Sequence, residues 1–188
     1  MQEAVPSGEG AMLAVLGMAA KELEKILEMN NKKYECFIAN DNSNLQVVVS
    51  GLKKDINLLS DDLNYRKIKN LNLSVSAPFH CKYMKSASEK MTTYINDLKI
   101  KELDKPIISN VTAKETKSSK EIKSLLISQI EKKVRWLESV EYMINNGVKN
   151  FVEIGPGKVL SGLIKRINKS VNVYSINTEE DIKLLLND

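Results

Sequence analysis

The chain has 188 residues, a net charge of +4 and 43% hydrophobic residues, which is enough apolar material for the core of a globular protein. No apolar run approaches the roughly 20 residues that a membrane-spanning helix needs. The positive charge is too small to indicate nucleic-acid binding by itself, and Cys36 and Cys81 lack the spacing of metal ligands. We therefore expect a protein without a membrane span, a nucleic-acid partner or a metal site.

The first 75 residues carry alternating strand and helix patterns. Leu71, Leu73 and Val75, for example, alternate with polar residues as in a half-buried strand. The predicted order is β-α-β-β-α-β, with strands over 12–16, 34–39, 46–49 and 71–75 and helices over 19–29 and 52–63. This order is typical of a ferredoxin-like unit from about Gly10 to Val75. RNA-binding versions need aromatic residues on the central strands, which the 46–49 strand lacks.

After residue 80 the pattern alternates between longer helices and short strands. Helices are predicted over 84–98, 118–130, 134–146 and 159–167, with a short one after Thr178, and strands over 106–111, 151–154 and 171–176. Ser118 followed three positions later by Glu121 indicates a capping box. Strands that alternate with helices predict βαβ units and a parallel sheet.

Two short segments allow both a structural and a functional interpretation. The run 40–44 (NDNSN) has the composition of a turn, and within it we take Asn40 and Asn42 as candidate substrate-binding residues. The segment 155–158 (GPGK) lacks the length and the ending of a phosphate-binding loop. Its glycines instead predict a tight turn from a strand into a helix.

The only histidine of the chain, His80, follows the last strand of the first half. Pro78 prevents the strand from continuing, so Phe79 and His80 should lie in a loop at a strand end, where catalytic side chains are often found. The ordinary interpretation is a partly buried ring with one hydrogen bond. The functional one is proton transfer near neutral pH. The chain contains no Gly-X-Ser-X-Gly nucleophile motif, and histidine alone does not perform acyl transfer.

Several segments together resemble the malonyl-CoA:acyl carrier protein transacylase family. They are residues 1–6 with 10–12, 42–43 with 46–48, 75–80, 136–143 and 154–160, in the family's order and across essentially the whole chain. Three residues, at two places in the chain, depart from the family pattern. Asn44 and Leu45 stand where bacterial members often have Pro-Gly, and Ala77 stands where Gly or Val is usual.

The resemblance implies an α/β fold in which a hydrolase-like parallel-sheet core carries an inserted ferredoxin-like βαββαβ subdomain. Residues 10–75 would be the subdomain, 76–188 the C-terminal part of the large domain, and 1–9 a connecting segment. Family members are longer. Their serine elbow, their oxyanion loop and the arginine that binds the malonyl carboxylate would all lie upstream of Met1. We therefore expect this chain to be a fragment that is inactive by itself.

The resemblance also implies roles for single residues. His80 corresponds to the catalytic base, the backbone carbonyl of Gln129 would orient its ring, and Phe79 would line the acyl pocket. The implied reaction is malonyl transfer from malonyl-CoA to acyl carrier protein in type II fatty acid biosynthesis, through a serine acyl-enzyme. No metal or cofactor is implied beyond the coenzyme A thioester, which is a substrate.

Three alternatives stay open. The chain could come from the acyltransferase domain of a polyketide synthase, which flanking sequence would reveal. It could be a non-catalytic, ferredoxin-like module that binds a small molecule without thioester chemistry. A carboxylate, Glu131 or Glu153, could orient His80 in place of Gln129. The 18 asparagines and 25 lysines suggest an AT-rich genome, which fits the cytoplasm of a bacterium or a plastid-type organelle.

Overall fold

The computed structural model describes residues 4–187, which form an α/β protein. The chain divides into two compact units, Met1–Ser139 and Val140–Asp188. The predicted subdomain, residues 10–75, is therefore one part of the first unit. Within residues 4–187, no helix combines the length and the apolar character needed to cross a membrane.

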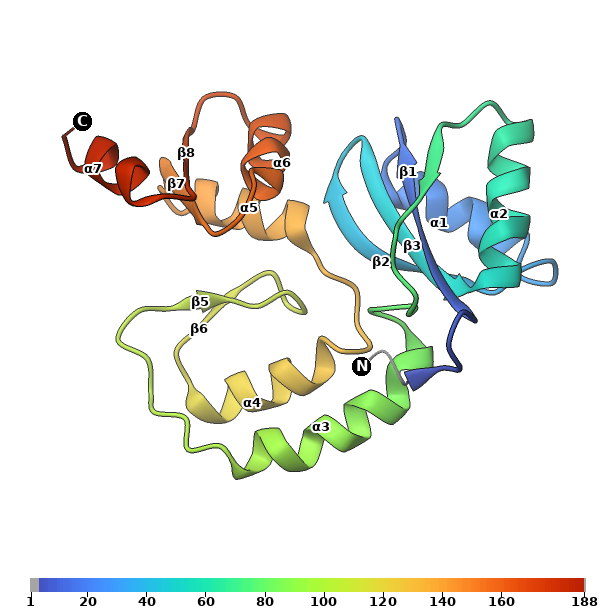
Figure 1. Ribbon diagram of the computed structural model, residues 1–188, viewed down its shortest axis with the longest axis horizontal. Coiled ribbons are helices and arrows are strands. Elements are labelled where there is room, and N and C mark those ends of the chain that lie inside the picture. Colours follow the sequence, from blue (N-terminus) through green and yellow to red (C-terminus); the bar gives the residue numbers. More distant parts are fainter. Residues whose placement is uncertain (1–3, 188) are drawn as a thin grey trace. The chain divides into compact units, whose positions relative to one another are not determined.

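The first unit is built on a four-stranded sheet of β1 (Gly10–Leu16), β2 (Cys36–Ser43), β3 (Gln46–Leu52) and β4 (Asn70–Asn72). The strands lie in the order β2-β3-β1-β4, and every neighbouring pair is antiparallel. The helices α1 (Ala20–Met29) and α2 (Lys53–Tyr65) connect β1 to β2 and β3 to β4, and both pack on the same face of the sheet (Figure 1).

Apolar clusters lie on both faces of the sheet. On the helical face, Leu13 and Val15 of β1 pack with Leu23 of α1 and Ile56 of α2. On the opposite face a smaller cluster forms from Met12, Ala14, Ala39 and Val48, with Leu73 and Phe79 packed against it. Because β1 and β3 are covered on both sides, their sequences are apolar runs and do not alternate.

Two predicted strands differ in length from the observed ones. The run 40–44 was predicted as a turn, but β2 continues through it to Ser43, with irregularities between Ile38 and Asn40 and between Asp41 and Ser43. The prediction that this whole run is a turn is therefore wrong. Strand β4 ends at Asn72, before the predicted end at Val75.

The rest of the first unit is mainly helical. A 3-10 turn, η2 (Lys82–Met84), leads into α3 (Lys85–Asp97). The short hairpin β5 (Ile107–Ile108) and β6 (Glu115–Thr116) precedes α4 (Ser119–Ser128), which lies beside α3 (Figure 1). The Ser118 hydroxyl caps α4 by accepting from the backbone N–H of Glu121 at 3.3 Å. The Glu121 carboxylate accepts from Thr116 at 2.5 Å, so it serves the preceding hairpin.

The second unit contains a parallel pair of strands. The helix α5 (Trp136–Asn145) crosses the division between the units. It is followed by β7 (Asn150–Ile154), α6 (Val159–Ile167), β8 (Asn172–Ile176) and α7 (Glu179–Asn187). Strands β7 and β8 pair in parallel through the crossover helix α6, which confirms the predicted βαβ unit.

The turn between β7 and α6 has the predicted glycine-dependent shape. Gly155 and Gly157 have φ values of 137° and 94°, in the region that favours glycine. The N–H of Gly155 donates to the carbonyl of Ile176 at 3.0 Å, and the N–H of Gly157 donates to Asn177 Oδ1 at 2.6 Å. These bonds fix the turn against the end of β8.

Candidate active site

The loop that carries His80 begins where β4 ends. Leu73 still donates its N–H to Met12 of β1 at 2.9 Å, but Val75 donates to Leu73 at 2.8 Å, which marks a turn. Ala77 and Pro78 follow and are fully buried. The predicted turn before Pro78 is therefore present, and it carries the next residues away from the sheet.

His80 itself has a left-handed backbone with φ of 61°. A non-glycine residue in this region costs roughly 1–2 kcal/mol and persists only where its surroundings hold it. One such contact is local, because the Cys81 thiol donates to the carbonyl of Pro78 at 3.0 Å, inside a buried environment. The backbone of the loop is therefore constrained on both sides of the histidine.

The imidazole ring has one defined partner. Nδ1 of His80 lies 2.7 Å from the backbone oxygen of Gln129. Gln129 is the C-cap residue of α4, and the last carbonyls of a helix have no partner inside the helix. With Nδ1–H donating to this carbonyl, Nε2 of the neutral ring carries a lone pair and can accept a proton.

A further polar contact supports Gln129. Asn110 donates from its side-chain amide to Gln129 Oε1 at 3.0 Å, and the carbonyl of Asn110 accepts from the N–H of Arg135 at 3.0 Å. Sequence reasoning missed Asn110, because nothing in the local sequence around 110 indicates that it meets the end of α4.

His80 lines a cavity of about 540 Å³. Its lining is mixed: Leu27 of α1 with Phe37 and Ile38 of β2 are apolar, and six residues are charged, Glu24, Glu28, Lys82, Glu131, Lys132 and Lys133. The cavity therefore places a proton acceptor next to space for a ligand.

Phe79, Asn40 and Asn42 do not line this cavity within the described part of the chain. Phe79 is half-buried and packs between the cluster around Met12 and a second cluster around Met84. Asn40 and Asn42 lie on β2, where Asn40 pairs with Val48 and forms a bridge with Val134. Their proposed contacts with substrate stay predictions.

The two carboxylates considered as partners of His80 differ in their surroundings. Glu131 lines the same cavity as the histidine. Glu153, on β7, accepts from the backbone N–H groups of Leu160 and Ser161 at 3.0 and 2.7 Å and from the Ser161 hydroxyl at 2.6 Å. These bonds hold the pKa of Glu153 below its usual range and assign both of its oxygens to the start of α6.

The cysteines are unsuited to act as nucleophiles. Burial raises the pKa of the Cys36 thiol to about 12, and burial also raises the pKa of Cys81. Thiols in such surroundings stay protonated at neutral pH and react slowly. Within residues 4–187, no group of three or more His, Cys, Asp or Glu side chains is arranged to hold a metal ion.

The chain was compared with known proteins. No family model matches it. It is 40% identical to the malonyl CoA-acyl carrier protein transacylase of Bacillus subtilis, over 99% of this chain and 59% of that protein. The structure of the malonyl CoA-acyl carrier protein transacylase of Clostridium perfringens matches with a TM-score of 0.94 and 36% identity, over 100% of this chain and 59% of the other.

The chain is thus related over its whole length to malonyl CoA-acyl carrier protein transacylases. It spans about 60% of the length of these transacylases. A malonyl-transacylase solved in complex with a type II PKS acyl-carrier protein also matches, with a TM-score of 0.92 and 33% identity, over 100% of this chain and 61% of the other. The matching regions cover 97–100% of this chain, so they include the His80 loop and the end of α4.

Proposed function

We propose that the protein carrying this sequence transfers malonyl from malonyl-CoA to acyl carrier protein, with His80 as the general base. The observation that carries the proposal is the 2.7 Å contact between His80 Nδ1 and the Gln129 carbonyl, in a chain related to transacylases throughout. This contact leaves Nε2 as the proton acceptor. No Gly-X-Ser-X-Gly motif occurs in the 188 residues, so the serine nucleophile is proposed to lie outside them.

In the first half-reaction, the serine hydroxyl attacks the thioester carbon of malonyl-CoA while His80 Nε2 takes its proton. The C–S bond breaks, a malonyl-serine ester forms, and the proton passes from His80 to the coenzyme A sulfur. The Gln129 carbonyl keeps the ring in one tautomer and one orientation throughout. Gln129 contributes its main chain here, and its side chain is bound to Asn110.

In the second half-reaction, the phosphopantetheine thiol of acyl carrier protein is the nucleophile. His80 Nε2 takes the thiol proton as sulfur attacks the ester carbon. It then returns the proton to the serine oxygen as the ester bond breaks. The reaction exchanges one thioester for another and needs no metal or cofactor besides its substrates. Fatty acid biosynthesis of the type II kind is the proposed setting, in the cytoplasm of a bacterium or in a plastid-type organelle.

The finer architecture follows from the same proposal. The antiparallel order β2-β3-β1-β4 with two helices on one face supports a ferredoxin-like βαββαβ subdomain over residues 10–75. The parallel pair β7 and β8 supports assignment of residues 76–188 to a hydrolase-like core, with residues 1–9 as the connection. We place Phe79 at the acyl group and Asn40 and Asn42 near the substrate.

Radioactive malonyl transfer from malonyl-CoA to purified acyl carrier protein tests the proposal. The intact protein that contains this sequence should label the carrier, and its His80→Ala variant should not. The 188-residue chain alone should be inactive, because it lacks the serine motif. Absence of transfer by the intact protein, together with tight equilibrium binding of an amino acid or nucleotide, would favour the small-molecule-binding alternative.

The identity of the carrier is a separate question, because one of the matching structures is a complex with a type II PKS acyl-carrier protein. Carrier proteins from fatty acid and from polyketide biosynthesis should be compared at equal concentration. Faster labelling of the fatty acid carrier is the expected result. Labelling of the polyketide carrier alone would assign the protein to polyketide synthesis.

A further inference from the structure

The residues that follow His80 are fixed by a carboxylate from the start of the sheet. Glu35 immediately precedes β2, and its Oε1 lies 2.6 Å from the Lys82 ammonium. Its other oxygen, Oε2, accepts from the Tyr83 hydroxyl at 2.5 Å. One carboxylate therefore holds two consecutive residues, and these begin only two positions after His80.

An aromatic contact reinforces this arrangement. The Lys82 nitrogen lies 5.3 Å from the ring centre of Phe37 and 5.5 Å from that of Tyr83, which is within the range of cation–π attraction. The two rings meet edge to face, with centres 5.8 Å apart. Together, Glu35, Phe37, Lys82 and Tyr83 form what is called here the Glu35 cluster.

On the sheet side of the cluster, the backbone at Glu35 and Cys36 packs against β3. A Cβ atom on Gly51 would lie 3.0 Å from the Glu35 carbonyl oxygen and 3.5 Å from Cys36 Sγ, so the two strands approach closely. Cys36 pairs with Gly51 in the ladder. The backbone that carries the Glu35 carboxylate thus packs against the central sheet.

The loop side of the cluster carries the strained backbone of His80. The ring is held at one end by the Gln129 carbonyl, and the left-handed conformation at His80 requires the flanking residues to stay in place. Lys82 and Tyr83 are the first residues after the buried Cys81 that contact a different strand through their side chains. Releasing them would allow the loop to relax toward ordinary backbone angles.

We propose that Glu35 is a positioning residue for His80, because it holds Lys82 and Tyr83 on the start of β2 and so fixes the segment that aims the ring. The inference rests on the proposed function, in which His80 is the base. Exposed ion pairs contribute little to global stability. The effect of Glu35 is therefore expected in the geometry of the loop and in the turnover number, with little change in melting temperature.

The test compares Glu35→Ala and Glu35→Gln in the intact protein with Glu89→Ala as the control. Glu89 also forms an exposed ion pair, with Lys85 at 3.9 Å, but it lies on α3 outside the cluster. The first readout is the His80 ring N–H resonance in 15N NMR, assigned by its absence in a His80→Asn variant. The second is the steady-state rate of malonyl transfer.

Glu35→Ala should speed exchange of the His80 ring N–H with water severalfold. It should also lower kcat by roughly three- to tenfold, because misplacing a catalytic group lowers the rate. Glu35→Gln keeps one acceptor oxygen and replaces the other with an amide NH2, so it can accept from Lys82 or from Tyr83 but not from both as the carboxylate does. It should therefore lower kcat less than Glu35→Ala. Glu89→Ala should match the parent protein in both readouts.

An unchanged exchange rate of the His80 ring N–H together with an unchanged kcat in Glu35→Ala would overturn the inference. If Glu35→Ala does not fold, Tyr83→Phe is the second variant, because it removes one of the two hydrogen bonds to Glu35. It should shift both readouts in the same direction. No shift in Tyr83→Phe would also overturn the inference. The NMR readout needs no substrate. A perturbed ring in a protein that never transfers malonyl would therefore reject the proposed reaction while the structural link between Glu35 and His80 stands.

Discussion

Gly10 of β1 and Pro78 of the His80 loop are in direct contact, and a Cβ atom on Gly10 would lie 2.3 Å from Pro78 Cδ. The same atom would lie 2.8 Å from the Pro78 nitrogen and 2.9 Å from Ala77 Cα, so the conflict involves backbone that cannot simply rotate away. The absence of a side chain at residue 10 thus lets the loop approach the sheet.

Gly10→Ala should destabilise the protein by about 1–3 kcal/mol, the usual cost of inserting a methyl group into packed structure. Urea unfolding followed by circular dichroism measures this effect. Gly162→Ala is the matched control, because it lies inside α6 with no atom within 4 Å of the added Cβ. That change should be neutral or stabilising by up to about 1 kcal/mol. Equal unfolding midpoints for Gly10→Ala and the parent protein would contradict the predicted close contact.

His80 and Gln129 should respond differently to truncation. His80→Ala removes the proposed base and should lower the transfer rate by roughly 10²–10⁴-fold. Gln129→Ala keeps the main-chain carbonyl that accepts from the ring, so it should lower activity only modestly, through loss of the bond to Asn110. Initial rates of both variants and of Glu131→Ala provide the comparison. A loss in Glu131→Ala that equals the loss in His80→Ala, with Gln129→Ala active, would replace the carbonyl by a carboxylate partner.

Phe79→Ser should weaken discrimination between malonyl and methylmalonyl groups. A methyl group in a tight pocket is worth about 1–3 kcal/mol, so a large but incomplete preference for malonyl is expected in the parent protein. Competition between the two coenzyme A esters measures the ratio directly. Phe79 also packs against the clusters around Met12 and Met84, so the melting temperature should be recorded alongside. An unchanged ratio in a folded variant would remove Phe79 from the acyl pocket.

Glu153→Gln should destabilise the second unit in a pH-dependent manner. Bonds from Ser161 and Leu160 lower the pKa of the folded Glu153 carboxyl, so its contribution is present above the ordinary pKa of about 4.5 and is lost as the pH falls through the folded value. At neutral pH the loss should be about 1 kcal/mol, typical of a helix cap. The melting temperatures of the parent protein and of Glu153→Gln should converge below pH 4.5.

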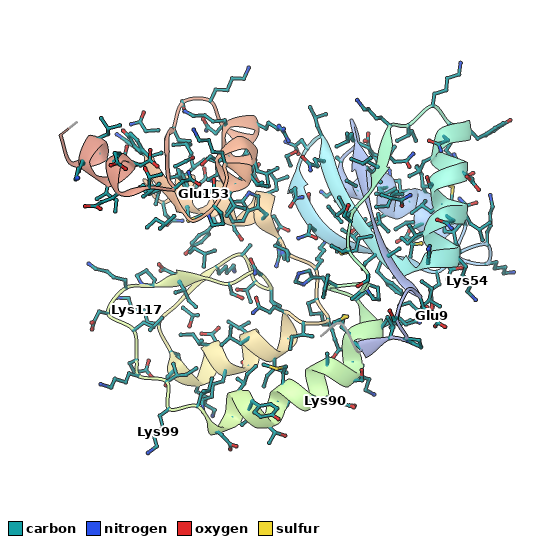
Figure 2. The ribbon with its side chains drawn as sticks, viewed as in Figure 1. Glu9, Lys54, Lys90, Lys99, Lys117 and Glu153 are labelled. Atoms are coloured by element: carbon teal, nitrogen blue, oxygen red, sulfur yellow. The ribbon has the colours of Figure 1, made fainter. Side chains whose placement is uncertain are left out.

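The control for this experiment is Glu179→Gln, which removes an exposed pair with Lys183 at 3.6 Å. This change should be close to neutral at all pH values. Figure 2 labels Glu153, which lies on β7 and accepts from the backbone N–H groups at the start of α6. If the difference in melting temperature between Glu153→Gln and the parent protein does not depend on pH, packing and not charge causes the loss of stability.

Local periodicity predicted most helices and strands, because their apolar faces pack against helices and strands close by in the sequence. The β-α-β-β-α-β order and the parallel pair β7 and β8 both follow from such patterns. The strand character of the run 40–44 could not be predicted in this way. Asp41 donates its N–H to Val134 at 2.9 Å, and Val134 donates to Ala39 at 2.8 Å, so a segment more than 90 positions later extends the strand.

For the same reason, the candidate site could be predicted only in part from the sequence. Pro78 and the lone His80 are local signals, and they placed the histidine in a loop after a strand. Glu35 and Asn110 carry no signal of their own, because their partners Tyr83 and Gln129 lie 48 and 19 positions away. Such contacts depend on tertiary packing, which hydrophobic periodicity does not encode.

A histidine oriented by a main-chain oxygen has a consequence for how this site evolves. The Gln129 side chain points to Asn110, so what the ring requires is the path of the backbone at the end of α4. Substitutions at residue 129 that leave the end of the helix in place should therefore preserve the orientation of the ring. A search for catalytic partners that compares side-chain identities would overlook this position. An insertion or deletion within α4 would damage the site more than most substitutions at 129.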